Sequence, residues 1–117
     1  MEKDQSFVDF IMDQLHSLGH VTHRRMFGAY GLYRKEIFFG IVFEGRLYFK
    51  TDEKTRREYV ECGMEPFRPN PRQTLKTYYE VPVDVLEDDR TLVQWAETAV
   101  RCQDAGARSK PGRKRER

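Results

Sequence analysis

Three histidines are the first residues of this 117-residue chain to suggest chemistry, because imidazole nitrogens bind transition metals. His16, His20 and His23 are the only histidines in the sequence. His16 lies on the expected solvent face of a helix that ends at Gly19, whereas His20 and His23 belong to the connection and strand that follow. Three ligands would have to converge across that break, so we predict ordinary surface histidines and no metal.

The hydroxyl, thiol and carboxylate groups show no spacing that is typical of an active site. Nucleophilic catalysis needs a hydroxyl or thiol beside a base, and glycoside hydrolysis needs two carboxylates. Cys62 and Cys102 are 40 positions apart without a CxxC motif, as incidental thiols in a reducing compartment often are. The glycines within residues 28–31 lack the GxGxxG spacing of a phosphate-binding loop. We therefore predict a non-enzymatic protein without a cofactor.

Arginine and tyrosine side chains near the first strands suggest a partner-binding surface, because both residue types favour interfaces. Adjacent residues of a strand point to opposite faces, so only one of two neighbouring arginines can join such a surface. The other arginine is expected to bind a carboxylate or a carbonyl. The alternative is that these arginines and tyrosines only stabilise the fold. The candidate residues are Arg24, Arg25, Tyr30, Tyr33 and Tyr48.

The end of the chain differs in charge from the rest. Residues 108–117 hold six basic residues and one acidic residue, a net charge of +5, whereas residues 1–107 hold 15 basic and 18 acidic residues, a net charge of −3. Such a composition predicts a disordered tail that either binds nucleic acid or only aids solubility. Its candidate nucleic-acid-binding residues are Arg108, Lys110, Arg113, Lys114, Arg115 and Arg117.

Hydrophobic periodicity predicts the elements that must position these residues. Apolar residues at 3.6-residue spacing predict a first helix over about residues 6–18, capped by Ser6 and Asp9. A period of two within residues 23–50 predicts a three-stranded antiparallel meander, with reversals at 34–36 and at Glu44-Gly45. Glycines inside these strands are expected to curl the sheet over the first helix.

The second half of the chain should add two helices and one more strand. Thr51 or Asp52 can cap a short helix that runs to Cys62. Three prolines predict an irregular loop over residues 65–72, before a strand at 74–81. A final helix begins at Asp89 and carries Trp95 on its apolar face, and the folded part should end at Ala105-Gly106.

Length and composition predict one domain, residues 1–107, followed by the basic tail at 108–117. The hydrophobic share of 38% is modest, but 13% aromatic residues supply large buried areas. No apolar run approaches the ~20 residues of a membrane span, and residues 1–6 do not resemble a signal peptide. We expect a cytoplasmic protein.

Five separated motifs resemble those of one known family, in the same order. Residues 24–33, with the sequence RRMFGAYGLY, resemble the R-M-F-G-G-Y-G-L-Y signature of the TfoX (Sxy) N-terminal domain family. Residues 47–52 resemble its L-Y-L-K-T-D, residues 63–67 its G-x-x-P-F, and residues 78–86 and 92–96 its Y-Y-x-V-P-x-x-x-L and L-x-x-W-A. Ala29 departs from the family's usual glycine, and the chain resembles a short stand-alone member lacking the C-terminal domain.

The resemblance implies an α+β fold of two layers, with a curved antiparallel sheet packed against helices in the order α-β-β-β-α-β-α. It also implies a regulatory role, because the family's namesakes activate competence genes by assisting the cyclic-AMP receptor protein. We therefore expect an adaptor that binds a protein of the transcription machinery and has no enzymatic activity or cofactor. A homodimer is compatible with this adaptor. Two alternatives remain: a nucleic-acid-binding accessory protein acting through its tail, and a small enzyme or ligand carrier with a pocket beneath residues 65–72.

Overall fold

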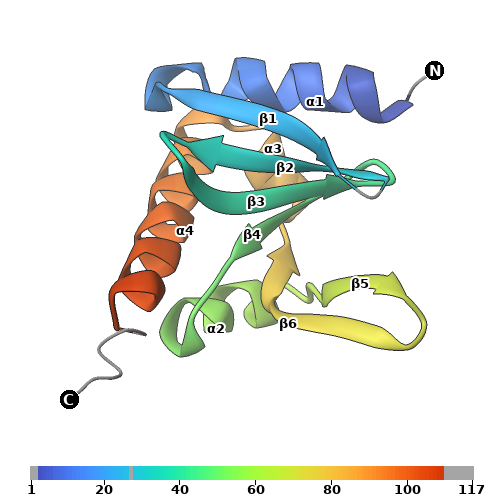
Figure 1. Ribbon diagram of the computed structural model, residues 1–117, viewed down its shortest axis with the longest axis vertical. Helices are drawn as coiled ribbons and strands as arrows, with labels where there is room; N and C mark the ends of the chain where they lie inside the picture. The colour runs from blue at the N-terminus through green and yellow to red at the C-terminus, as the bar shows by residue number, and fades with distance from the viewer. Residues whose placement is uncertain (1–2, 27, 110–117) are drawn as a thin grey trace.

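The computed structural model describes the backbone of residues 3–26 and 28–109 and the side-chain environments of residues 5–26 and 28–105. Its strands form one antiparallel sheet in the order β1-β2-β3-β4-β6-β5, and its helices lie mainly behind one face of that sheet (Figure 1). The strands are β1 (Val21–Met26), β2 (Ala29–Arg34), β3 (Ile37–Phe43), β4 (Arg46–Lys50), β5 (Pro66–Asn70) and β6 (Gln73–Glu80). The helices are α1 (Lys3–Gln14), α2 (Glu53–Glu61), α3 (Val83–Leu86) and α4 (Asp89–Ser109).

This architecture confirms the predicted α+β fold, a curved antiparallel sheet packed against helices. The predicted order of elements was incomplete, because the meander has four strands instead of three and β5 is a further strand. The two predicted reversals are confirmed as two-residue turns. The residues at their centres have positive φ angles, 57° and 112° at Lys35 and Glu36 and 50° and 77° at Glu44 and Gly45.

The first helix begins earlier than predicted. It starts at Lys3, so Ser6 and Asp9 lie inside it and do not cap its start; Asp9 instead accepts a hydrogen bond from Gln5 Nε2 at 3.2 Å. The α-helix ends at Gln14 and a 3-10 turn, His16–Leu18, follows it. Gly19, with a φ of 80°, ends that turn, as its freedom to adopt positive φ allows.

The proline-rich segment was wrongly predicted to be an irregular loop. Pro66–Asn70 forms the edge strand β5, whose partner is β6, and its register shifts twice along the pairing. An edge strand needs backbone donors on one side only, so prolines and bulges are tolerated there. Proline is excluded mainly from central strands, and β5 tolerates it because the sheet topology places β5 at an edge.

The predicted start of α2 is confirmed, and α4 is longer than predicted. Asp52 accepts a hydrogen bond from the Thr55 backbone N–H at 2.8 Å, while the Asp52 N–H donates to Thr55 Oγ1 at 3.0 Å, which confirms the predicted cap. The helix α4 continues to Ser109, past the predicted end at Ala105-Gly106.

None of the helices in the part of the chain that the structure describes is long and apolar enough to cross a membrane.

The core lies between the sheet and the helices. Its largest fully buried side chains include Phe39, Phe49, Ile11, Leu32 and Leu92, drawn from α1, α4 and three central strands. A second, smaller cluster lies apart from this core. We call it the open-face cluster; its buried members are Ile41, Tyr48, Phe67 and Tyr78.

Candidate partner-binding groove

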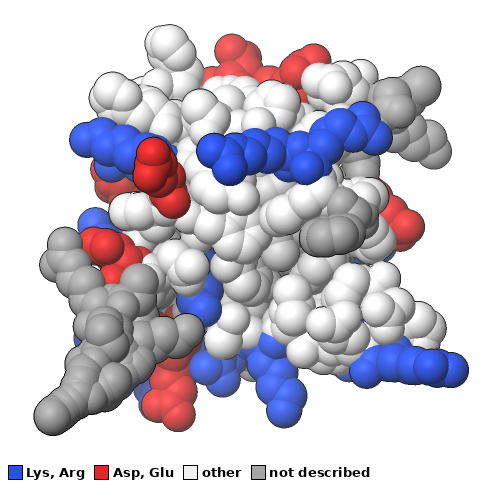
Figure 2. Space-filling model, in the orientation of Figure 1, with Lys and Arg blue, Asp and Glu red and all other residues white. Residues whose placement is uncertain are grey.

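The face of the sheet turned away from the helices carries an apolar groove of about 470 Å³. Its lining comes from the first three strands and from the β5–β6 hairpin, which lies below them in Figure 1. In the space-filling view of this face, uncharged surface lies between a band of mainly Lys and Arg side chains on the β1–β2 side and further cations below (Figure 2). The lining residues are Met26, Ala29, Phe38, Ile41, Phe43, Phe67, Pro69, Asn70, Gln73, Leu75 and Tyr78.

A β-bulge in β3 gives this groove its aromatic walls. Leu32 pairs with Gly40 and Tyr33 pairs with Phe38, so Phe39 is the extra residue between two pairs. The extra residue shifts the alternation of side chains. Phe38 and Ile41 therefore both belong to the open-face cluster, while Phe39 belongs to the core.

Gly31 has no side chain and so leaves room for two residues that line the groove. A Cβ atom at this position would lie 2.7 Å from Met26 Cε and 2.9 Å from Phe38 Cε1, closer than packed carbon atoms approach. Gly31 therefore marks a close approach of neighbouring side chains. Met26 and Phe38 occupy the space that a larger residue would fill.

The five predicted partner-binding residues are divided between the two faces of the sheet. On the open face, the Arg24 guanidinium carbon lies 4.9 Å from the centre of the Tyr33 ring. On the helix face, the Arg25 guanidinium carbon lies 5.4 Å from the Tyr30 ring, and Arg25 donates a hydrogen bond to the Tyr30 hydroxyl at 3.3 Å. The two arginines thus lie on opposite faces, and Arg25 binds a phenol instead of the expected carboxylate or carbonyl.

Two of the predicted tyrosines are buried and cannot form an exposed platform. Tyr30 is 4% exposed and belongs to the core, where its hydroxyl donates to Gln5 Oε1 at 3.2 Å. Tyr48 is 8% exposed, and its ring centroid lies 4.7 Å from that of Phe67 within the open-face cluster. Burial raises the pKa of Tyr48, as expected for a phenol that loses contact with water.

The groups first considered for metal binding and nucleophilic catalysis do not assemble. His16, His20 and His23 are exposed, and among residues 5–26 and 28–105 no three His, Cys, Asp or Glu side chains are placed to share a metal ion. Cys102 lies 3.6 Å from Thr55 Oγ1, and burial raises the pKa of its thiol, which disfavours the nucleophilic thiolate. Cys62 is an exposed free thiol.

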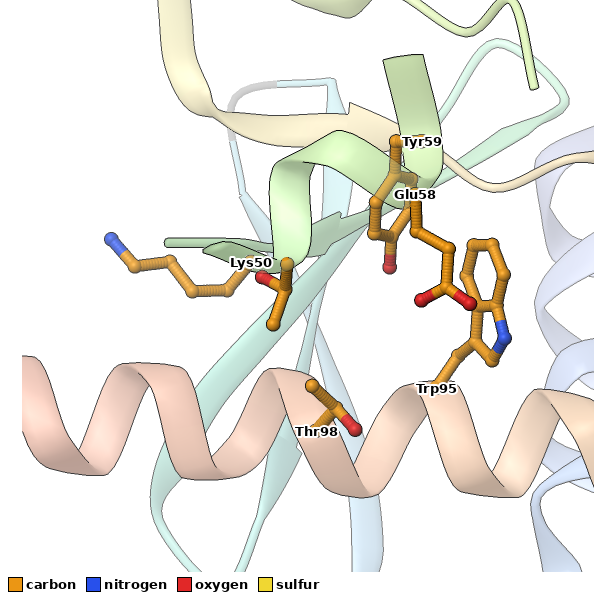
Figure 3. Close-up of a pocket in the computed structure, with 6 residues that line it drawn as sticks. Lys50, Glu58, Tyr59, Trp95 and Thr98 are labelled. Atoms are coloured by element: carbon orange, nitrogen blue, oxygen red, sulfur yellow. The ribbon is translucent and has the colours of Figure 1, made fainter. Parts of the chain in front are cut away.

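A small cavity between α2 and α4 contains polar groups but has room for little more than one water molecule. Its volume is about 20 Å³ (Figure 3). The Tyr59 hydroxyl and the Glu58 carboxylate point toward it, whereas the Lys50 amino group points away (Figure 3). The ring of Trp95 packs edge-on against Tyr59, so the cavity belongs to a helix–helix contact.

Sequence reasoning missed Phe38, Phe43 and Phe67 as candidate site residues. Strict alternation along β3 would have placed Phe43 on the same face as Phe39, and only the bulge separates Phe39 in the core from Phe43 in the open-face cluster. The pocket expected beneath residues 65–72 does exist, as the part of the groove lined by Phe67, Pro69 and Asn70. The described residues that line the groove include no charged side chain.

The structure is an α+β domain whose sheet packs against helices on one face and carries an apolar groove on the other. The family model of the TfoX N-terminal domain matches residues 13–103, and the chain belongs to this family. The chain is also similar to "DNA transformation protein TfoX1" of Aliivibrio fischeri (strain ATCC 700601 / ES114), with 30% identity over 80 residues. This alignment covers 67% of the chain but only 36% of the relative's length.

Proposed function

We propose that this chain is a non-enzymatic adaptor of the competence type, which regulates transcription in the cytoplasm by binding a protein partner in the groove. Family membership and the relative's role in DNA transformation support the regulatory role. The groove supports the mode of action, because a soluble domain rarely leaves a continuous apolar and aromatic surface without a use.

The side chains that line the groove indicate which kind of partner segment would bind there. Its walls are aromatic and aliphatic, so they match an apolar segment of a partner protein. Arg24 on β1 is exposed and lies over the Tyr33 ring, which contacts the groove residue Phe38, and Arg72 is exposed in the turn after β5. The partner is therefore an apolar segment with acidic residues beside it, because opposite charges at the rim select the partner and speed association.

Phe43 is the residue at which this function can be tested. It is half-buried, lines the groove and packs edge-on against Phe67 with ring centroids 5.3 Å apart. Phe10 on α1 is a matched control, because it is a phenylalanine with 41% exposure that does not line the groove. Replacing each by alanine removes the same side chain from two different surfaces.

The experiment is affinity capture from an extract of the source cells, with nuclease treatment, using the unmodified chain and both variants. We expect a protein of the transcription machinery to be recovered, with at least about 10-fold less on Phe43→Ala and an unchanged amount on Phe10→Ala. A photo-crosslinking amino acid at position 43 should join the same protein. Thermal melting of each variant confirms that it is folded.

Three results would contradict the proposal. Recovery that disappears after nuclease treatment would indicate a nucleic-acid-binding protein instead. Equal recovery by Phe43→Ala and the unmodified chain would remove the groove from the interaction. A small hydrophobic molecule found in the groove by native mass spectrometry would make the chain a ligand carrier.

A further inference from the structure

The outer edge of β1 is a second candidate surface: it adjoins the groove at Met26, and no other described strand pairs with it. The strand lies at one end of the sheet and pairs only with β2. Its four central residues, Thr22 to Arg25, are exposed. The opposite edge strand, β5, contains prolines and register shifts that interrupt its row of donors, whereas β1 has neither.

The register shows which backbone groups of β1 point outward. The Lys35 N–H donates to the His20 carbonyl at 3.1 Å, and His20 stands opposite Lys35 in the continuation of the β1–β2 register. Because hydrogen-bonded pairs alternate in an antiparallel ladder, Thr22, Arg24 and Met26 bond to β2. The N–H and C=O groups of Val21, His23 and Arg25 therefore point away from the sheet, where a further strand could bind them.

The positive charges of Arg24 and Arg25 indicate which kind of strand could pair with the β1 edge. Arg24 and Arg25 are adjacent, point to opposite faces and are each held over a tyrosine ring. The sequence of β1, VTHRRM, contains no carboxylate. Antiparallel pairing of β1 with the same strand of a second copy would thus bring four guanidinium groups together, which disfavours self-association through this edge.

We propose that the β1 edge binds an extended acidic segment of a protein partner by strand addition. Two consecutive carboxylates in that segment would point to opposite faces and meet Arg24 and Arg25, while its backbone bonds to Val21, His23 and Arg25. The tyrosines beneath the guanidinium groups limit their rotation, which lowers the entropy lost when the carboxylates bind. This inference is independent of whether the groove binds the same partner.

The probe is a short peptide of valine and threonine with a central pair of glutamates, titrated into the isotopically labelled full chain. We expect amide shifts at β1 in NMR spectra and slowed hydrogen exchange at the outward N–H groups of Val21, His23 and Arg25. The same peptide with lysines in place of the glutamates, or with methyl groups on the backbone nitrogens that face β1, should bind at least about 10-fold more weakly. Equal binding of either control peptide would overturn the proposal.

Substitutions in the chain itself also test binding at the β1 edge. Arg24→Glu with Arg25→Glu should weaken peptide binding at least about 10-fold, whereas the matched charge reversal Lys54→Glu with Arg57→Glu on α2 should not. His23→Pro removes an outward N–H without removing a bond to β2, so it should weaken binding relative to His23→Ala. If His23→Pro is unfolded by circular dichroism, the N-methylated peptide provides the same test.

The outcomes distinguish the edge from the other surfaces. Shifts confined to groove residues such as Phe43, together with unchanged binding by the Arg24 and Arg25 variants, would overturn the edge proposal and leave the groove intact. Duplex DNA producing the β1 shifts in place of the acidic peptide would assign the two arginines to phosphate binding, and would also overturn it. Loss of binding by Phe43→Ala alone would bear only on the groove.

Discussion

The indole of Trp95 meets the phenol ring of Tyr59 edge-on, with ring centroids 4.7 Å apart and ring planes inclined by 65°. This contact joins α4 to α2, and both residues pack against the main core. Edge-to-face aromatic pairs contribute about 0.5–1.5 kcal/mol beyond the area they bury. The pair therefore links the family's L-x-x-W-A segment to a residue 36 positions earlier in the chain.

Replacing Trp95 by alanine should lower the free energy of unfolding by about 3 kcal/mol, because a large half-buried side chain is removed. Denaturant unfolding measures the loss. A double-mutant cycle with Tyr59→Leu should give a coupling of about 1 kcal/mol between the two rings. A loss below about 1 kcal/mol for Trp95→Ala would mean that α4 does not dock as described.

Stability should decrease at high pH because of Tyr78. Burial raises the pKa of Tyr78 to about 12, from an ordinary value near 10. The unfolded chain then loses the phenolic proton before the folded chain does. The contribution is fully present below about pH 10 and is lost as the pH rises toward 12. Unfolding of Tyr78→Phe should depend less on pH in this range, and a phenolate absorbance that appears at pH 10 for every tyrosine would contradict the burial.

The turn between β2 and β3 should be improved by glycine. Glu36 has a φ of 112°, which is unfavourable for a residue with a side chain. Glu36→Gly should therefore raise the free energy of unfolding by about 1 kcal/mol, because relief of this strain exceeds the added entropy of the unfolded chain. Gly45→Ala at the next turn is the control in the opposite direction: it places a side chain at a φ of 77° and should lower the free energy of unfolding. A destabilised Glu36→Gly would show that the conformation at this turn is not strained.

Chelators should leave the thermal stability unchanged. The three histidines are exposed, and the described residues contain no cluster of three ligands. Elemental analysis of protein purified without an affinity tag tests this directly. One equivalent of tightly bound zinc would show that the histidines or Cys62 and Cys102 bind metal in a way that their positions do not suggest.

DNA binding by the isolated chain, if present, should reside in residues 108–117 and depend little on base sequence. Arg108 lies in the last turn of α4, and the other five candidate cations lie outside the described residues. If all six cations neutralise phosphates on duplex DNA, log K should fall with log salt at a slope of about −5. A chain ending at Ala107 should lose this binding with almost no change in melting temperature.

Titration of the full and shortened chains against duplex DNA at two salt concentrations tests this prediction. Retained affinity after shortening would place the nucleic-acid site on the folded domain. No affinity in either chain would mean that the basic residues only aid solubility.

The sequence by itself determined the local structure and the family. Period-two and 3.6-residue patterns predicted most of the strands and helices, because alternation and helical spacing are properties of the backbone alone. The Asp52 cap and the Glu44-Gly45 turn depend on residues within three positions of each other, so they too could be predicted. The five motifs identified the family, which the family model confirmed.

Only the tertiary structure decided which surfaces remain open. The proline-rich segment became an edge strand because β6 was available as a partner, and a bulge at Phe39 turned Phe38 toward the open face. Tyr30 and Tyr48 look like interface residues in the sequence, yet both are buried by elements that lie far away along the chain. Burial depends on contacts between segments distant in sequence, and a local pattern carries no information about which face such segments will cover.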